Sequence, residues 1–160
     1  MGASRASSPR SEGLEFICFD GSWRLCDDGF VRPVFSAAVR AENGAWVPAV
    51  FLADVAADRT VLSEDLWQAL GPPSQPSGQH LEGLGGRVSS VSVTTAIRLQ
   101  RETGTTVLFN GQFAACTDAA ALDMSVLGRD ITNLFAVIID RPQDLVCMLG
   151  QGHRYTISGA

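Results

Sequence analysis

The chain has 160 residues, a length that favours one domain with a single hydrophobic core. Hydrophobic residues make up 46% of it and charged residues 18%, which excludes collagen-like, low-complexity and wholly disordered chains. The net charge of −5 argues against nucleic acid as a partner, and no apolar run approaches the roughly 20 residues of a membrane helix.

Residues 1–13 are rich in serine and lack hydrophobic periodicity, so they are predicted to form a flexible leader. Residues 14–160 are predicted to form one domain. The N-terminus shows no apolar core of a signal peptide, which favours a cytoplasmic protein. In that compartment cysteines are expected to be reduced and mostly buried, although two disulfides in a secreted protein remain the alternative. The four cysteines, whose spacing does not suit zinc, are Cys18, Cys26, Cys116 and Cys147.

Short apolar runs alternate with turn signals along the rest of the chain, and this rhythm predicts a mostly β protein. Residues 34–40 and 46–52 are predicted to form one hairpin, and residues 91–99 and 105–109 a second one, each around a turn signal. The turn signals are Asp20-Gly21, Asp28-Gly29, Asn43-Gly44, Thr103-Gly104 and Asn110-Gly111.

Two segments interrupt the β pattern. Residues 63–70 are predicted to form a short helix, because Ser63 can cap it, acidic residues follow in its first turn and a Gly-Pro-Pro sequence ends it. Residues 72–78 contain three prolines and are predicted to be a surface connection. The second interruption is residues 130–135.

Asp54 lies within an apolar run, residues 48–57, where an ionised carboxylate is costly unless it is paired or hydrogen-bonded. Taken alone, it is explained as a strand end whose side chain caps the following turn. Two similar sequences are interpreted as ordinary turns: Asp20 begins a tight Asp-Gly turn, and Asp118 caps a helical turn.

Three motifs nevertheless occur in order. They are Asp-Val-Ala-Ala-Asp-Arg-Thr-Val-Leu at residues 54–62, Glu-Gly-Leu-Gly-Gly at 82–86 and Ser-Val-Leu-Gly-Arg-Asp-Ile at 125–131. Together they resemble the retropepsin-like aspartic proteases over about residues 32–157. In that family an Asp-Thr/Ser-Gly-Ala loop closes a hydrophobic strand, a glycine-rich hairpin forms a mobile flap, and a hydrophobic-hydrophobic-Gly-Arg segment opens the C-terminal helix.

The resemblance implies an all-β, retropepsin-like acid protease fold: a closed β-barrel-like domain with a glycine-rich flap hairpin and one short C-terminal helix. It implies an aspartic endopeptidase with Asp54 as the catalytic residue and Val55, Ala56 and Ala57 as the active-site loop. Because the chain has one such loop, the pair of aspartates would come from a symmetric homodimer. The implied substrate is a peptide or protein in extended conformation, with no metal and no cofactor.

The chemistry of such a pair follows from electrostatics. Two aspartates within hydrogen-bond distance cannot both ionise, so they share one proton and hold a water molecule between them. The ionised carboxylate takes a proton from that water as it attacks the peptide carbonyl, and the protonated one stabilises the oxygen that becomes negative.

The resemblance also implies an ion pair between Asp58 and Arg129, which would tie the active-site loop to the start of the helix. The alternative for Arg129 is a solvated cation, although a positive charge is disfavoured at a helix N-terminus. The resemblance also implies that the glycine-rich segment is a flap, whose backbone can approach an extended substrate closely. Without the resemblance, the segment would be interpreted as an ordinary glycine-rich turn. Its residues are Gly83, Leu84, Gly85 and Gly86.

Two residues depart from the family pattern, since Val55 and Ala56 stand where a hydroxyl residue and a glycine are usual. Val55 would lose one hydrogen bond between subunits for each subunit, leaving a buried backbone group unpaired at a cost of ~1–3 kcal/mol. Ala56 would be strained if its φ were positive. Two hypotheses therefore remain beside chance resemblance: an active homodimeric endopeptidase, and a protease-like homodimer that has lost catalysis and binds peptides by strand addition.

Overall fold

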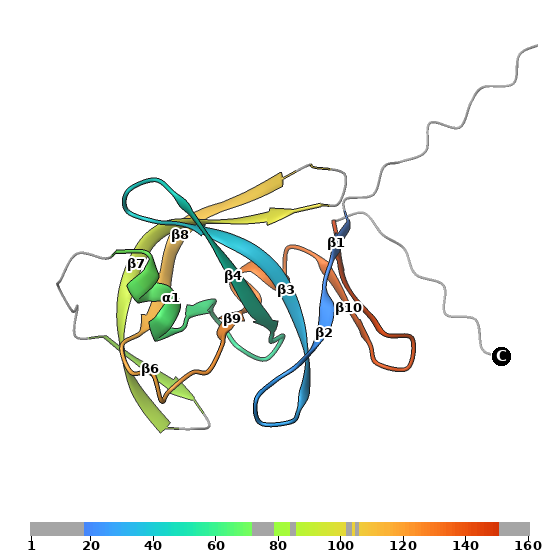
Figure 1. Ribbon diagram of the computed structural model, residues 1–160, viewed down its shortest axis with the longest axis horizontal. Coiled ribbons are helices and arrows are strands. Elements are labelled where there is room, and N and C mark those ends of the chain that lie inside the picture. Colours follow the sequence, from blue (N-terminus) through green and yellow to red (C-terminus); the bar gives the residue numbers. More distant parts are fainter. Residues whose placement is uncertain (1–17, 72–78, 84–85, 102–103, 105, 151–160) are drawn as a thin grey trace, which may run out of the picture.

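The computed structural model describes residues 18–71, 79–83, 86–101, 104 and 106–150. Most of them lie in strands of two sheets (Figure 1). The 8-stranded sheet contains β2 (Ser22–Leu25), β3 (Val31–Arg40), β4 (Trp46–Ala53), β5 (Val61–Leu62), β6 (Gln79–Gly83), β7 (Gly86–Gln100), β8 (Thr106–Cys116) and β9 (Ser125–Leu127). The 3-stranded sheet contains β1 (Cys18–Asp20), β10 (Ala136–Asp140) and β11 (Leu145–Leu149). The helices are α1 (Glu64–Ala69) and α2 (Arg129–Thr132).

The larger sheet closes on itself. Its strand order is β2-β3-β4-β9-β5-β8-β7-β6, and β3 pairs in addition with β7, with Val39 opposite Ile97. Two pairs of strands in it, β4–β9 and β5–β8, are parallel. The prediction of a closed, barrel-like, mostly β domain is therefore confirmed.

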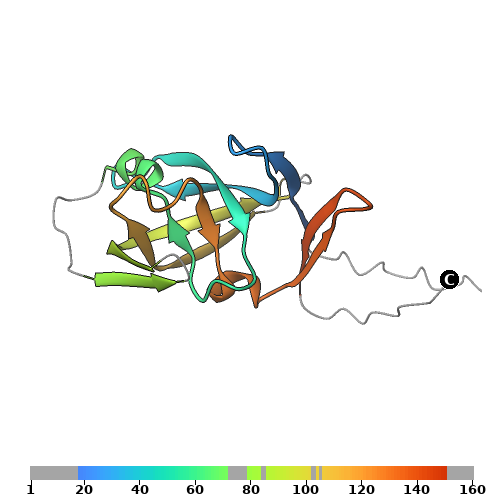
Figure 2. The same ribbon diagram turned by 90° about the horizontal axis from the view of Figure 1, so that it is seen from below.

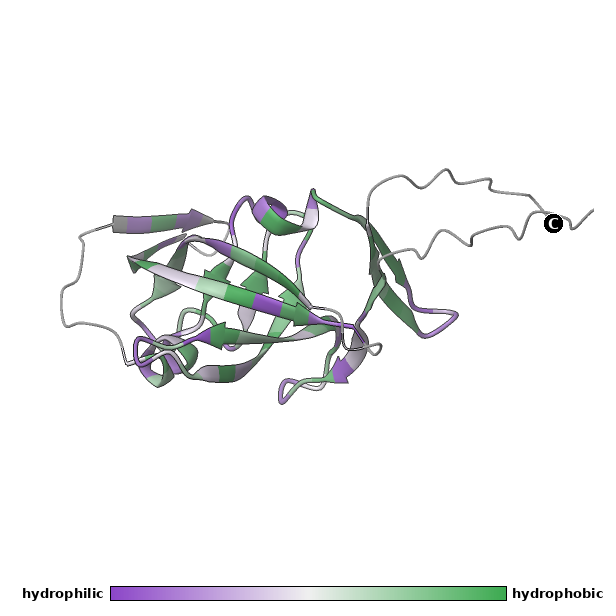
Figure 3. Cartoon of the chain, turned by 90° about the horizontal axis from the view of Figure 1, so that it is seen from above, coloured by the Kyte–Doolittle hydropathy of each residue, from purple (hydrophilic) through white to green (hydrophobic). Residues whose placement is uncertain are grey.

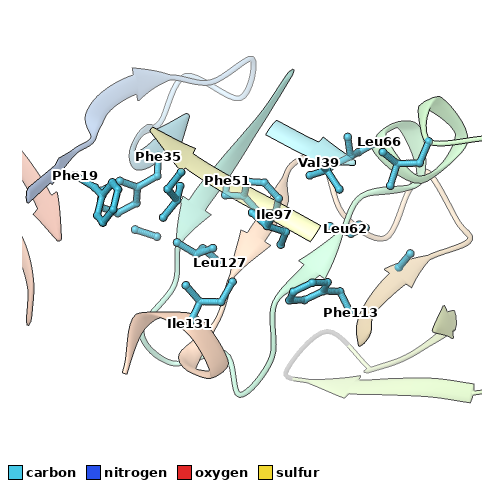
Figure 4. Close-up of a cluster of buried hydrophobic side chains, with 14 of the residues drawn as sticks. Phe19, Phe35, Val39, Phe51, Leu62, Leu66, Ile97, Phe113, Leu127 and Ile131 are labelled. Carbon is cyan, nitrogen blue, oxygen red and sulfur yellow. The ribbon is translucent and has the colours of Figure 1, made fainter. Parts of the chain in front are cut away.

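The interior of this barrel holds the hydrophobic core. Hydrophobic and hydrophilic residues alternate along the strands (Figure 3), so that one face of the sheet turns inward. The residues that meet in the centre are almost fully buried, and each such side chain contributes about 1.5–3 kcal/mol to folding. They include Phe35, Val39, Phe51, Leu62, Ile97 and Leu127 (Figure 4).

Both predicted hairpins are present, as β3–β4 and β7–β8. The turn between β3 and β4 has Gly44 at φ +83°, as an Asn-Gly turn requires. The predicted turn at Asn110-Gly111 is wrong, because both residues lie inside β8, opposite Ala96 and Thr95. The continuous pairing of β8 with β7 outweighs the local preference of Asn-Gly for a turn.

The predicted tight turn at Asp20-Gly21 is also absent. The chain instead passes at Gly21 from β1 in the smaller sheet to β2 in the larger one, and Gly21 N donates to Val146 O at 2.8 Å. A Cβ at this position would lie 2.6 Å from Val34 O. Glycine is therefore required here by close approach of the backbone.

The first predicted helix is confirmed as α1, with Ser63 at its N-cap position, but the Ser63 side chain makes no capping hydrogen bond. The Ser63 hydroxyl lies 3.1 Å from Ser125 Oγ, and Ser63 N donates to the same Ser125 oxygen at 2.9 Å. Ser63 thus joins β5 to β9. The second interruption of the β pattern, residues 130–135, overlaps the short helix α2, which strands β10 and β11 follow.

The four cysteines are all free thiols, with Cys116 and Cys147 buried and the other two half-buried. Within the described residues, no helix combines the length and the apolar character needed to cross a membrane. The predicted leader, residues 1–13, lies outside the described part of the chain.

Candidate active site

The loop that begins at Asp54 is held against the start of α2. Strand β4 ends at Ala53, which pairs in parallel with Leu127 of β9, and Asp54 N donates to Leu127 O at 3.3 Å. Farther along the loop, Arg129 N donates to Ala57 O at 2.8 Å. Figure 2 shows this loop and α2 side by side at one edge of the molecule. The first and third sequence motifs are therefore neighbours in space.

The Asp54 carboxylate is fixed through one of its two oxygens. Asp54 Oδ1 accepts hydrogen bonds from Ala56 N at 2.9 Å and from Ala57 N at 3.1 Å. The side chain thus caps the turn that it begins, as the simpler of the two interpretations predicted. Asp54 Oδ2 has no hydrogen-bond partner among the described residues. One oxygen orients the half-buried carboxylate, and the other remains able to hold a water molecule or a proton.

The tip of the loop is apolar and exposed. The Val55 side chain is 54% exposed, and Ala56 is exposed as well. Among the described non-glycine residues, positive φ occurs at Asp144, so Ala56 does not carry the backbone strain that a positive φ would bring. The methyl group of Ala56 is therefore compatible with the loop as it is folded here.

A partly buried network of hydrogen bonds supports the end of the loop. Thr60 is fully buried, and its hydroxyl donates to Asp130 Oδ1 at 2.7 Å and accepts from Gly128 N at 3.1 Å. Thr60 N donates to the same Asp130 oxygen at 2.9 Å. Sequence reasoning gave neither Thr60 nor Asp130 a role, although both lie within the quoted motifs. Together they fasten the end of the loop to α2.

Replacing Thr60 by valine is expected to lower the free energy of unfolding by about 1–3 kcal/mol. The substitution keeps the side-chain shape but leaves Gly128 N without its acceptor and Asp130 Oδ1 without one donor. Urea denaturation of Thr60→Val measures the loss, and Thr106→Val, at an exposed position of β8, is the matched control. Equal effects of the two substitutions would contradict the role given to this network.

Arg129 and Asp58 form an ion pair, between Arg129 Nη2 and Asp58 Oδ1. Their side chains are 50% and 77% exposed, so the pair adds at most about 1 kcal/mol to stability. Its effect is to orient Asp58 within the loop relative to the first residue of α2. Because Arg129 pairs with Asp58, it is not the wholly solvated cation of the alternative interpretation.

The glycine-rich motif lies at the end of the β6–β7 hairpin. Gly83 is opposite Gly86, whose φ is +108°, and Glu82 and Arg87 form a cross-strand ion pair at 2.9 Å. Leu84 and Gly85 lie outside the described residues. In Figure 1 the described end of this hairpin and the loop after β4 both lie toward the lower side of the molecule.

The described residues contain no group of three His, Cys, Asp or Glu side chains able to hold a metal ion. A solved retropepsin-like aspartic protease from Rickettsia conorii is similar to the chain, with a TM-score of 0.52, 19% sequence identity, and coverage of 84% of this chain and 91% of that one. The fold is retropepsin-like. A second solved structure, EIAV protease in complex with an inhibitor, has a TM-score of 0.46, 22% identity, and coverage of 64% and 86%. No protein-family model and no curated protein sequence matches the chain.

Within this retropepsin-like fold, sequence and structure agree on which segments meet. Asp58 and Arg129, predicted to form an ion pair, are brought together by the parallel pairing of β4 with β9, and Asp54 begins the same loop. The arrangement provides one oriented carboxylate at the end of an interior strand, beside an exposed apolar side chain. A single carboxylate can accept one proton, but a water molecule held for peptide hydrolysis needs an acid as well as a base.

Proposed function

We propose that the chain is an aspartic endopeptidase that acts as a homodimer, with Asp54 of two copies sharing one proton and one water molecule. The observation that carries the proposal is the Asp54 carboxylate, fixed at Oδ1 by two backbone N–H groups and free at Oδ2. The retropepsin-like fold supports it. The substrate is a peptide in extended conformation, lying between the loop and the β6–β7 hairpin.

Two observations support a homodimer. The sequence has one loop of the Asp54 type, and the tip of that loop is exposed. A symmetric pair would place the two Asp54 loops at the two-fold axis, where Val55 of each copy would be covered by the other. In that arrangement the two carboxyl groups cannot both be ionised, so the pair holds one proton between them. One Asp54 then serves as the base toward water, and the other donates its proton toward the carbonyl oxygen.

Cleavage of an unfolded protein, followed from acid to neutral pH, tests the proposal. We expect a bell-shaped dependence of rate on pH, because one carboxyl group must be ionised and its twin protonated. A pepstatin-like mimic of the tetrahedral intermediate is expected to inhibit at every active pH. No cleavage at any pH, or cleavage that the mimic leaves unchanged, would contradict the proposal.

The second candidate is a protease-like homodimer that binds peptides without cutting them. It is favoured by Val55, which cannot donate the hydrogen bond that a hydroxyl residue makes to the partner loop. A chain of this kind would still hold an extended peptide by strand addition.

The double variant Val55→Thr with Ala56→Gly tests whether the missing hydroxyl and the added methyl group are what impairs the loop. Restoring the hydroxyl in both subunits is expected to raise activity or to tighten the dimer by about 10–100-fold, the value of two recovered hydrogen bonds. Initial rates and sedimentation equilibrium measure the two effects, with Val55→Ala as the control that shortens the side chain without adding a hydroxyl. An unchanged rate together with an unchanged dimer constant would contradict this explanation of the loop.

A further inference from the structure

Two of the free thiols lie on the same face of the smaller sheet. Phe19 of β1 and Met148 of β11 are almost fully buried and belong to the hydrophobic core (Phe19 is labelled in Figure 4). Side chains of a strand alternate between its two faces, so the residues beside them in the sequence, Cys18 and Cys147, lie on the opposite face. Because β1 pairs with β11, the two cysteines are near neighbours.

The Cys18 thiol is directed toward Cys147. In the register of β1 with β11, Asp20 is opposite Cys147, so Cys18, two residues earlier, is diagonal to Cys147. Cys18 Sγ donates to Asp20 Oδ1 at 3.5 Å, and the thiol therefore leans along β1 toward the position that faces Cys147. The two thiols also hydrogen-bond to each other. The register and the side-chain contacts thus bring the same two sulfur atoms together.

We infer that Cys18 and Cys147 are a redox-sensitive pair, which a low-molecular-weight disulfide such as oxidised glutathione converts to an intrachain disulfide between β1 and β11. Cys18, the half-buried member, loses its proton to water and attacks one sulfur of the reagent, which releases one glutathione thiolate. Cys147, the buried member, then loses its proton and attacks the Cys18 sulfur of the mixed disulfide, which releases the second glutathione. Two protein thiols are oxidised, and one glutathione disulfide is reduced to two thiols.

The surroundings of the two thiols make this reaction slow at neutral pH. Burial, together with the hydrogen bond to Asp20 and the charge of Asp20, raises the pKa of Cys18 to about 11. Burial also raises the pKa of Cys147. Because the thiolate is the attacking species, the rate is expected to rise as the pH rises toward the pKa of Cys18. The pair therefore responds to prolonged oxidising conditions and not to a brief pulse.

Closing the bond requires a small movement of β1. Cα atoms on a diagonal of an antiparallel pair are about 7–8 Å apart, whereas a disulfide spans about 4.4–6.8 Å between Cα atoms. Strand β1 is 3 residues long and, among the described strands, pairs with β11 alone, so it can approach β11 by about 1 Å without breaking a second ladder. The bond would fix β1 to a strand that lies about 130 residues later in the chain.

Oxidation of the full chain by oxidised glutathione at mildly alkaline pH, followed by mass spectrometry of a non-reducing digest, tests the inference. We expect a pair of peptides joined through Cys18 and Cys147, lighter by two hydrogens than the two reduced peptides. Cys26→Ser, which removes the other half-buried thiol, is the matched control and is expected to form the same link. Thiols that stay reduced, a link between other cysteines, a link between two chains, or glutathione that remains on Cys18 would overturn the inference.

Urea denaturation measures what the bond does to the fold. By closing a long loop in the unfolded chain, the disulfide is expected to raise the urea midpoint by about 1–2 M, and dithiothreitol is expected to reverse the shift. Cys18→Ser is expected to unfold at the same midpoint in oxidising and reducing buffer. A linked chain with the midpoint of the reduced chain would contradict a bond that holds β1 on β11. Neither experiment depends on peptide cleavage, so the inference stands apart from the proposed function.

Discussion

Asp54→Asn is expected to lower the rate of peptide cleavage by about 10²–10⁴-fold, the contribution of a positioned acid or base. Asparagine has the shape of aspartate and keeps an oxygen able to accept the hydrogen bonds from Ala56 N and Ala57 N. It cannot take a proton from water or share one with its twin. The loop is therefore expected to stay folded while the chemistry is lost. Initial rates measure activity, and thermal unfolding checks the fold.

The chain contains a matched control for this substitution. Asp118 also begins a turn and accepts from a backbone N–H two residues later, that of Ala120, at 2.9 Å. Asp118→Asn thus changes the same chemical group in a similar turn, in a segment with no hydrogen bond to the Asp54 loop, and is expected to leave the rate unchanged. Comparable cleavage by wild type and Asp54→Asn would mean that another protein or another residue cuts the peptide.

Gly128→Ala is expected to have the largest effect on stability, lowering the free energy of unfolding by about 3 kcal/mol. A Cβ at this position would lie 2.2 Å from the carbonyl carbon of Arg59 and 2.7 Å from Thr60 N. These are backbone atoms, so no side-chain rotation relieves the clash. Separating the two segments would also break the hydrogen bond from Gly128 N to the Thr60 hydroxyl. Urea denaturation measures the loss.

Gly111→Ala is the control, because the nearest atom to its added Cβ would be Cζ of Phe113 at 3.6 Å, an ordinary contact. We expect this variant to lose far less stability than Gly128→Ala. If the two variants unfolded at the same urea concentration, close packing of Gly128 against the loop could not be what holds α2 in place.

The β architecture could be predicted from the sequence because alternation and turn residues are local signals, as the β3–β4 hairpin around Asn43-Gly44 shows. Where a local signal competed with long-range pairing, prediction failed. Asn110-Gly111 has the composition of a turn but lies within a long strand, and the Ser63 hydroxyl faces Ser125 instead of the helix. These outcomes depend on which strands meet, and residue preferences alone do not encode that.

Some residues of the candidate site were likewise predictable from the sequence, and others were not. The ion pair of Asp58 with Arg129 was predictable because the motifs that contain them occur in a recognisable order. Thr60 and Asp130 were missed because a threonine beside valine and leucine looks like an ordinary strand residue, and only the docking of this segment against α2 gives its buried hydroxyl a partner.

The central claim, that two copies each contribute one Asp54, is tested most directly by mixing wild type with a tenfold excess of Asp54→Asn. After subunits exchange, most wild-type chains would be paired with an inactive partner. Activity per wild-type chain is then predicted to fall about tenfold, in proportion to the remaining wild-type pairs. An equal excess of Asp118→Asn should cause no such fall. Activity unaffected by excess Asp54→Asn would show that one chain works alone and would contradict the shared site.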